Sequence, residues 1–218
     1  MAINYFQSPE EADILVRTIT SDGGNAAAIQ ADMAEPSAIS RLVEETVRIH
    51  GGLDILVNNV GQYTEEGLIR LPVEKWDWVM NTNLRSSFLA AQAIFPYQQA
   101  AGWGRIVNIA AGSAFVRNHS AYGLAKQAVC TLTEVLALEL APTVTVNAVA
   151  PGLVDDPDVP GGIKDSFQKD TPLRRLVTYQ QVADLTALFC SPAFDMVTGQ
   201  VIAMDGGQTI PRALVPVE

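Results

Sequence analysis

The chain has 218 residues, 48% of them hydrophobic, which is enough for one large core, so we expect a single domain over residues 1–218. Its 24 acidic residues outnumber its 14 basic residues and give a formal net charge of −10, which disfavours binding to nucleic acids or to anionic membrane surfaces. No basic leader precedes an apolar run, no stretch is long enough to span a membrane, and the two cysteines, Cys130 and Cys190, suit buried thiols in a reducing compartment, so we expect a cytoplasmic protein.

Short runs rich in Val, Ile and Leu alternate with longer stretches of helical period, which predicts an α/β fold with a parallel sheet wrapped by helices. Each strand candidate is almost continuously apolar, as strands covered on both faces must be. The expected strands are Ala2 to Tyr5, Ala26 to Ala31, Leu53 to Asn58, Arg105 to Ala110, Thr143 to Ala148 and Gln200 to Met204. The expected helices run from Pro9, capped by Ser8, until Gly23 and Gly24, from Pro36 to about His50, from Val73 to Ala100, from Ser120 to Leu140 and from Gln180 to Cys190.

One irregular segment, from Pro151 to Thr171, is rich in Pro, Gly and Asp and follows the carboxyl end of a predicted strand. Open α/β sheets bind ligands at that edge, so we interpret residues 151–171 as a mobile substrate lid, with an ordinary surface loop as the alternative. The lid would present apolar side chains that suit many ketones and alcohols, namely Leu153, Val154, Val159, Ile163 and Phe167.

Tyr122 and Lys126 are four residues apart and therefore share one face of a predicted helix. A phenol titrates at about 10 and is a poor proton donor at neutral pH, but a nearby ammonium group lowers its pKa. The pair predicts a phenol tuned for acid–base chemistry, and two solvated surface neighbours are the alternative. Only two histidines, His50 and His119, are available as metal ligands, and we expect no metal site.

Six motifs follow one another along the whole chain, and one of them contains this pair. They are Leu-Asp-Ile-Leu-Val-Asn-Asn-Val-Gly from Leu53, Asn-Thr-Asn-Leu from Asn81, Gly-Arg-Ile-Val-Asn-Ile from Gly104, Ser-Ala-Tyr-Gly-Leu-Ala-Lys from Ser120, Val-Asn-Ala-Val-Ala-Pro-Gly from Val146 and Thr-Gly-Gln-Val-Ile-Ala-Met-Asp-Gly-Gly from Thr198. In order and spacing the sequence resembles the short-chain dehydrogenase/reductase family. The resemblance implies a doubly wound, Rossmann-like sheet and transfer of hydride between NAD(P) and a carbonyl or alcohol.

The resemblance implies catalytic roles for three of these residues. Tyr122 corresponds to the general acid that protonates the substrate oxygen, and Lys126 to the residue that binds the nicotinamide ribose and lowers the pKa of the tyrosine. Asn83 corresponds to the residue that holds a water in a proton relay, although it could instead only bond a neighbouring strand.

Further positions match the cofactor-binding residues of the family. By resemblance, Asp32 and Met33 lie at the adenine, and Asn59 with Gly61 forms the turn beside the cofactor. Alternatively, Asp32 only caps the next helix, and Asn59 and Gly61 only form a turn. The last matching turn, beside the nicotinamide, is Pro151 and Gly152.

One departure from the family concerns the substrate oxygen. The serine that bonds the substrate carbonyl in the family is replaced here by Ala111, which cannot donate a hydrogen bond. Ser113 takes over this role in one interpretation and is only a loop residue in the other. Losing one such donor costs about 10²- to 10³-fold in rate.

The second departure is the absence of a glycine-rich turn after a first strand, which normally lets backbone N–H groups meet the pyrophosphate. The opening Ala2 to Tyr5 instead resembles the second strand of the family, so a central strand is missing beside Leu53 to Asn58. We expect that such a gap cannot simply remain. Either the opening segment takes the central position, or the two amino-terminal strands detach, or the natural protein starts upstream of Met1, and we favour the third hypothesis.

We therefore predict an NAD(P)-dependent oxidoreductase acting on a small carbonyl or alcohol, with an activity that the missing turn could impair. Asn4 stands where an acidic residue would select NAD, so NADP is favoured and NAD stays open. The alternative is an inactive relative that acts through assembly. In either case we expect a homo-oligomer, a dimer or tetramer, formed through the helices before Ala101 and Pro142.

Overall fold

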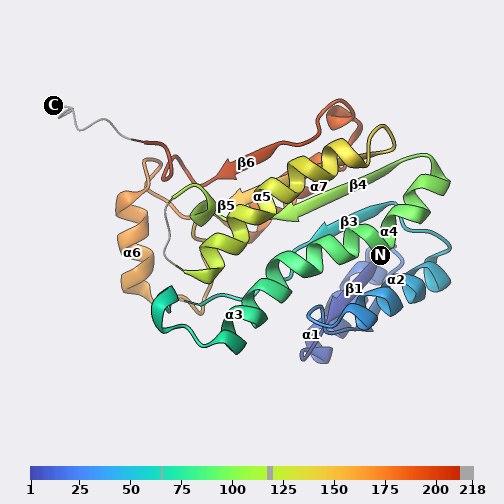
Figure 1. The fold of residues 1–218 in the computed structure, drawn as a ribbon, viewed down its shortest axis with the longest axis horizontal. Helices are drawn as coiled ribbons and strands as arrows, with labels where there is room; N and C mark the ends of the chain where they lie inside the picture. The colour runs from blue at the N-terminus through green and yellow to red at the C-terminus, as the bar shows by residue number, and fades with distance from the viewer. Residues whose placement is uncertain (65, 117–119, 212–218) are drawn as a thin grey trace.

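The computed structural model describes residues 1–64, 66–116 and 120–211, and it shows the predicted α/β fold of parallel strands covered by helices (Figure 1). The strands are β1 (Ala2–Tyr5), β2 (Ala27–Gln30), β3 (Ile55–Asn58), β4 (Gly104–Ile109), β5 (Val144–Pro151) and β6 (Val201–Met204). The longer helices are α1 (Pro9–Ser21), α2 (Pro36–His50), α3 (Val73–Met80), α4 (Ser86–Ala101), α5 (Ala121–Glu139), α6 (Gly161–Asp170) and α7 (Tyr179–Phe189). His119, one of the two histidines, lies outside the described residues.

The main core lies on the two faces of the four-stranded sheet β3-β4-β5-β6. On one face, Ile106 of β4 and Val146 of β5 pack in one cluster with Ile94 of α4 and Leu136 of α5. On the other face, β4 and β5 pack against α7, where Phe189 is buried. This double cover explains why these strands are apolar at nearly every position.

A chain of buried amides connects β3, β4 and α5. Asn58 Nδ2 donates to Asn108 Oδ1 at 2.9 Å, and Asn108 Nδ2 donates in turn to the Thr133 hydroxyl at 2.9 Å. The Thr133 hydroxyl donates to the Val129 carbonyl, so this series of hydrogen bonds ends on the backbone of α5. Each of these three buried polar side chains has a hydrogen-bond partner. The series of hydrogen bonds therefore fixes β3, β4 and α5 relative to one another at little desolvation cost.

The helix predicted from Val73 to Ala100 is one continuous helical segment with a π turn inside it. The five residues Asn81–Arg85 form this π turn between α3 and α4. Single π turns of this kind occur often at functional sites. The turn carries Asn83, one of the predicted catalytic residues.

Two local expectations need correction. The segment 151–171 is not irregular throughout, because it contains helix α6 and because β5 continues to Pro151. Pro160 precedes α6 as its N-cap, and a proline just before a first turn directs the chain into a helix. Ser8 does precede α1, but its side chain makes no capping hydrogen bond.

The expectation that a gap cannot remain is wrong for this structure. β1 pairs with β2 as a separate two-stranded sheet, and β1 does not move to the central position beside β3. Figure 1 shows the β1–β2 pair beyond the β3 edge of the larger sheet. The pair is held there because α2 packs on α4 and because Arg85 donates to the Ala34 carbonyl at 2.6 Å.

Within the described ranges, no helix combines the length and the apolar character needed to cross a membrane.

Candidate active site

Tyr122 lies in the first turn of α5, where the chain enters the helix through a capped start. The Ser120 hydroxyl accepts a hydrogen bond from the Gly123 N–H at 3.0 Å, which is an N-cap interaction. Tyr122 and Trp76 both pack against the cluster of Val79 of α3 with Ala121 and Ala125 of α5. The start of α5 and the end of α3 therefore hold the Tyr122 ring together.

A second phenol lies against the first. The rings of Tyr63 and Tyr122 meet edge to face, with their centroids 5.1 Å apart and an angle of 80° between their planes. This geometry is the preferred one for aromatic pairs. Tyr63 belongs to the segment after β3, so this segment lies against the ring of Tyr122.

Lys126 is buried beside Tyr122, as the four-residue spacing predicts. Its side chain is only 4% exposed, and its Nζ lies 5.6 Å from the centroid of the Tyr122 ring. The Nζ donates to the Ile109 carbonyl, at the end of β4, at 2.7 Å. Burial lowers the pKa of Lys126 to about 8, because the charged ammonium is desolvated.

The expected lowering of the Tyr122 pKa is not what the structure shows. Burial, together with a smaller contribution from the neighbouring Tyr63 phenol, raises the pKa of Tyr122 to about 12. Desolvation of the phenolate therefore outweighs the attraction of the ammonium group, whose Nζ is turned toward the Ile109 carbonyl. Tyr122 is consequently protonated at neutral pH.

Asn83 and Gly61 meet next to Lys126. Asn83 Nδ2 donates to the Gln62 and Val79 carbonyls, both at 2.9 Å, which fixes the amide between the π turn and the segment after β3. A Cβ on Gly61 would lie 2.2 Å from Asn83 Oδ1 and 3.2 Å from Lys126 Nζ. Only glycine fits this close approach.

Asn83 Oδ1 is buried, and no described residue donates a hydrogen bond to it. A buried acceptor without a partner is uncommon, because it costs about 1–3 kcal/mol to leave one unsatisfied. The atom therefore marks a position for a further donor in this site.

Pro151 and Gly152 bring the end of β5 against the end of β6. The Gly152 N–H donates to the Met204 carbonyl at 2.9 Å, and a Cβ on Gly152 would lie 3.1 Å from the Cα of Asp205. Asp205 is held by hydrogen bonds from Thr209, so this turn is tightly built. Glycine again permits the approach of two backbones.

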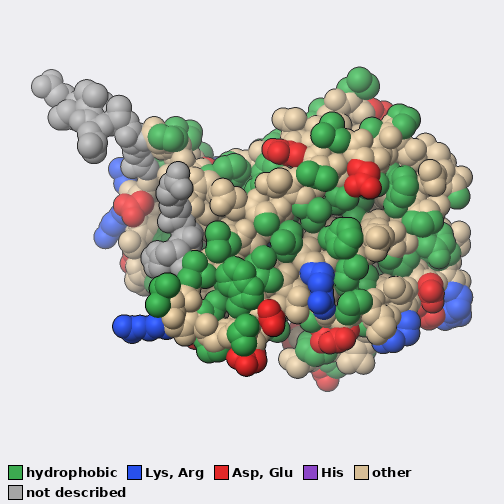
Figure 2. Space-filling view, viewed as in Figure 1, with side chains coloured by type: hydrophobic (Ala, Val, Ile, Leu, Met, Phe, Trp, Pro, Cys, Tyr) green, Lys and Arg blue, Asp and Glu red, His purple; other side chains and the backbone are tan. Residues whose placement is uncertain are grey.

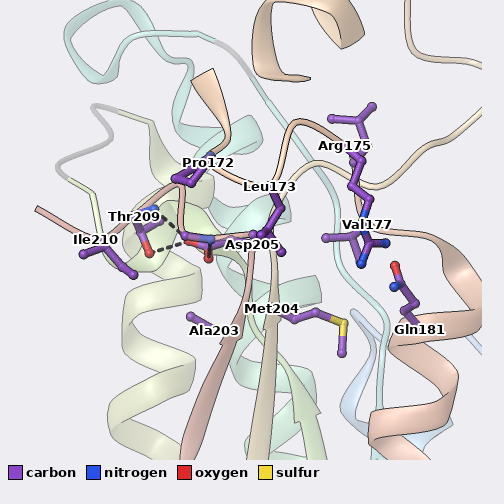
Figure 3. Close-up of a pocket in the computed structure, with 13 residues that line it drawn as sticks. Pro172, Leu173, Arg175, Val177, Gln181, Ala203, Met204, Asp205, Thr209 and Ile210 are labelled. Atoms are coloured by element: carbon purple, nitrogen blue, oxygen red, sulfur yellow. Dashed lines mark hydrogen bonds between the residues drawn. The ribbon is translucent and has the colours of Figure 1, made fainter. Parts of the chain in front are cut away.

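An open pocket of about 650 Å³ lies at this carboxyl end of β6. Figure 3 shows its labelled residues, with the Asp205–Thr209 hydrogen bonds at its wall and Gln181 on α7 at its side. Its lining is mainly apolar and comprises Pro172, Leu173, Leu176, Val177, Ala203, Met204 and Ile210, with Arg175 and Gln181 among the polar residues. The apolar residues predicted for the lid do not line it; the segment after α6 does.

The residues predicted at the adenine and at the cofactor turn lie at the carboxyl ends of two different sheets. Asp32 follows β2, and its Oδ1 accepts from the Ala34 N–H at 2.8 Å, so it forms a turn before α2. Met33 beside it is half-buried, whereas Asn59 after β3 is exposed. Asp32 therefore forms a turn and does not cap α2, the alternative given for it, because the N-cap residue is Glu35; its role at the adenine stays a prediction.

Ser113 lies on a short 3-10 helix, Gly112–Ala114, which packs against α5. Its hydroxyl oxygen is buried and has no hydrogen-bond partner among the described residues. Ala111 precedes this helix in extended conformation and offers only a methyl group. Ser113 is thus the hydroxyl that this loop places in a buried position beside α5.

The described residues fit one end of a nicotinamide dinucleotide but not its middle. Lys126, Gly61 and the unsatisfied Asn83 Oδ1 form a cradle for a ribose and a ring. No described strand-to-helix connection supplies a glycine turn for the pyrophosphate: β1 leads into α1 through Phe6 to Ser8. No group of three His, Cys, Asp or Glu residues within the described ranges could hold a metal ion.

Sequence reasoning missed Tyr63 and the pocket residues after α6. Tyr63 follows the predicted turn at Asn59 and Gly61 by only two residues, and that proximity was the available signal. The pocket had no such signal, because its walls come from β6 and from a segment about 30 residues earlier. The two contact one another only in the fold.

Comparisons with known proteins agree with this geometry. The family profile described as enoyl-(acyl carrier protein) reductase matches residues 1–209. The D-beta-hydroxybutyrate dehydrogenase of Rhizobium meliloti is 34% identical and aligns over 96% of this chain and 88% of its own. A 3-oxoacyl-[acyl-carrier-protein] reductase of Synechocystis sp. is 33% identical over 96% of this chain and 87% of its own.

Solved structures extend the same likeness to three dimensions. The gluconate 5-dehydrogenase from Burkholderia cenocepacia, determined in complex with NADP and tartrate, superposes with a TM-score of 0.89 at 27% identity. The match covers 97% of this chain and 86% of that one. The chain belongs to the short-chain dehydrogenase/reductase family of oxidoreductases.

Proposed function

We propose that this protein moves hydride between NADP and the carbonyl or alcohol group of a small molecule. The observation that carries the proposal is the meeting of Tyr122, Lys126 and Asn83 around Gly61, where only a glycine fits. A buried ammonium group, a half-buried phenol and an unsatisfied amide oxygen in one place are costly to keep without a function.

In the reducing direction, Tyr122 donates its phenolic proton to the substrate oxygen. Its raised pKa keeps that proton on the phenol at neutral pH, and the Lys126 ammonium stabilises the phenolate left behind. The buried Ser113 hydroxyl donates a hydrogen bond to the same oxygen. Asn83 Oδ1 accepts a hydrogen bond from a water that returns the proton.

The bound nicotinamide supplies the hydride, or accepts it in the opposite direction. Lys126 would hold the ribose, and the turns at Gly61 and at Pro151–Gly152 would face the ring. Two observations favour NADP over NAD: the NADP complex of the gluconate dehydrogenase, and the uncharged Asn4 at the end of β1. Asn4 donates to the Ala31 carbonyl at 3.0 Å and places no carboxylate near a phosphate.

The substrate class is supported by the apolar pocket next to Gly152. Its walls would hold the apolar part of a small carbonyl or alcohol, and Arg175 and Gln181 are the polar groups available at its side. Helix α6, with Ile163 and Phe167 partly exposed, lies beyond the carboxyl ends of the strands and would act as the lid (Figure 1).

The assembly part of the proposal rests on an apolar face. Figure 2 shows hydrophobic side chains gathered over α4 and α5, and Phe88, Val135 and Leu138 are exposed there, the last to 83%. We propose that this face pairs two or four copies of the chain. The free thiols Cys130 and Cys190 are consistent with a reducing, cytoplasmic setting.

Titration with NADPH tests the proposal. Trp76 packs in the same cluster as Tyr122, so its fluorescence should report binding. Saturable quenching that is lost in Lys126→Ala and kept in Lys75→Ala, a partly exposed lysine elsewhere, supports the cofactor site. Unchanged fluorescence up to millimolar NADPH, with an intact fold by circular dichroism, would instead favour the inactive assembly partner.

A further inference from the structure

Tyr63 is an aromatic residue whose position the hydrophobic core does not explain. It belongs to none of the described core clusters and is 58% exposed, whereas Tyr122, which it contacts, is half-buried. The edge-to-face contact with Tyr122 uses only part of its ring. Much of the ring is therefore accessible, directly beside the residue proposed as the proton donor.

The backbone just before Tyr63 is fixed to the π turn. The Gln62 carbonyl accepts a hydrogen bond from Asn83 Nδ2 at 2.9 Å, and the same amide donates to the Val79 carbonyl at 2.9 Å. Gly61 approaches Asn83 so closely that a Cβ there would lie 2.2 Å from Asn83 Oδ1. The chain therefore reaches Tyr63 from a point that is held by α3 and the π turn.

The backbone just after Tyr63 is fixed as well. Thr64 is only 4% exposed, and its hydroxyl accepts from the Glu66 N–H at 3.3 Å. The Glu66 carboxylate forms an ion pair with Lys75 of α3. Because the backbone is held on both sides and a tyrosine has only two side-chain torsions, a ligand that contacts this ring costs it little conformational freedom.

The same segment is joined to the start of α5. Gly67 and Ser120 form an isolated antiparallel bridge, and Ser120 is the N-cap of the helix whose first turn carries Tyr122. The ring of Tyr63 is therefore placed against Tyr122 by backbone pairing as well as by the ring contact. A side chain held in this way beside a reacting group can orient a ligand without first having to be ordered.

The accessible ring would lie along a substrate that meets Tyr122. The substrate oxygen must come within hydrogen-bond distance of the Tyr122 hydroxyl, which brings the groups on the carbonyl carbon close to a ring whose centroid is 5.1 Å from that of Tyr122. Aromatic rings attract one another in offset or edge-to-face contacts by more than the area they bury. A saturated ring of the same size gains no such term.

The pocket at the end of β6 does not make this distinction. Its apolar lining consists of aliphatic side chains and a proline, and none of the described residues that line it is aromatic. Aliphatic walls accept a phenyl and a cyclohexyl group about equally well, since both bury apolar area. A preference for flat substrates would therefore arise outside this pocket.

We propose that Tyr63 is a specificity-determining residue, whose accessible ring selects substrates that carry their carbonyl on an aromatic or conjugated ring. The proposal rests on the function proposed above, because it needs Tyr122 to be the residue that meets the substrate oxygen.

The test compares acetophenone with cyclohexyl methyl ketone, its saturated counterpart. Titrations followed by NMR chemical shifts give the dissociation constant of each ketone, without any need for turnover. Tyr63→Leu should lower the preference for acetophenone, taken as the ratio of the two constants, by about threefold to tenfold. Tyr63→Phe keeps the ring and should keep the parental ratio.

A matched control removes an exposed aromatic residue elsewhere. Trp103 is 43% exposed and precedes β4, at the end of that strand opposite to the site, so Trp103→Leu should leave the ratio unchanged. All three variants should melt within a few degrees of the parent, since each changes an exposed side chain. The parental ratio in Tyr63→Leu, or binding of neither ketone by the parent, would overturn the proposal.

NADPH-dependent reduction of the two ketones separates this proposal from the proposed function. A binding preference that depends on the Tyr63 ring, with no reduction of either ketone, supports the role of Tyr63 in recognition and contradicts the proposed function. Reduction of both ketones with a ratio of kcat/KM values that Tyr63→Leu does not change supports the proposed function and contradicts the role of Tyr63.

Discussion

The two ends of this sheet differ in how completely they are built. β5 is buried along nearly its whole length and pairs on both sides, whereas β1 is partly exposed at every position and pairs on one side. The complete end holds Tyr122, Lys126 and the Pro151–Gly152 turn. The open end is where the phosphates of a dinucleotide would have to be held. The residues proposed for proton transfer are thus packed and hydrogen-bonded, while no described residue supplies a glycine turn at the proposed phosphate end.

The largest expected effect lies in the complete end. Tyr122→Phe removes the proton donor and should lower NADPH-dependent carbonyl reduction by about 10²- to 10⁴-fold, while the concentration of NADPH at half-saturation changes little. Steady-state absorbance kinetics and fluorescence titration measure the two quantities. Equal activity in the variant and the parent would remove Tyr122 from the mechanism.

The next largest effect concerns the substrate oxygen. Ser113→Ala should lower the rate by about 10²- to 10³-fold if its hydroxyl is the donor there. Adding Ala111→Ser to that variant should restore part of the loss, since it returns a hydroxyl to the neighbouring position. If Ser113→Ala reduces at the parental rate, the residue is only part of the loop.

Substitutions at the two ends of the sheet should differ in their cost to stability, because the two ends differ in packing. Asn108→Ala removes the acceptor at 2.9 Å from Asn58 Nδ2 and the donor to the Thr133 hydroxyl, both buried, and should lower the free energy of unfolding by about 2–4 kcal/mol. Asn4→Ala, in the open end, should cost only about 1 kcal/mol, because its amide bonds a partly exposed strand end. Urea titrations give both values, and equal costs would mean that the two ends are equally well packed.

Lys126 should show the cost of a buried charge. Its pKa falls from 10.5 to about 8 on burial, so the folded state disfavours the protonated form. Below pH 8 that cost is fully present, and from pH 8 to 10.5 the unfolded chain binds more protons, so stability rises with pH. Lys126→Met should therefore raise the free energy of unfolding at pH 7. The net gain should be about 1–3 kcal/mol, once the loss of the hydrogen bond to the Ile109 carbonyl is subtracted.

The check is the pH dependence of that gain. The difference between Lys126→Met and the parent should shrink as the pH rises from 8 to 10.5, in parallel urea series. A constant difference would show that Lys126 titrates normally.

The smallest effect tests a local strain. Arg174 has a φ of 55°, in the left-handed region, which costs a non-glycine residue about 1–2 kcal/mol. Arg174→Gly should raise the free energy of unfolding by about 0.5 kcal/mol, since glycine also frees the unfolded chain. Arg175→Gly, whose φ is not positive, should lower it, and a gain in both would point to charge rather than strain.

Most of the fold could be predicted from the sequence because the strands are buried on both faces. The apolar runs predicted all six strands to within a few residues, and Pro36 with Gly51 marked both ends of α2. The π turn at Asn81–Arg85 was not readable, since those residues continue the helical period. Helix α6 was hidden because it begins with two glycines and because Ile163 and Phe167 are its only apolar residues, too few for a clear helical period.

The residues that form the site could be predicted from the sequence, but the shifts of their pKa values could not. The spacing of Tyr122 and Lys126 predicts their proximity, and the structure places Lys126 Nζ 5.6 Å from the ring centroid. The direction of the Tyr122 pKa shift depends on burial and on Tyr63, which comes from another part of the chain. Spacing along one helix carries no information about such desolvation.

The π turn has a consequence for how this site tolerates change. A π turn holds one residue more than an α turn, so the helix before it is rotated by roughly 100° relative to a straight continuation. Val79, before the turn, packs with Ala121 and Ala125 of α5, while Asn83, inside the turn, donates to the Gln62 and Val79 carbonyls and lies against Gly61. Loss of any one residue between Asn81 and Arg85 would rotate α3 and its Val79 contact relative to α4, even if every remaining side chain were kept.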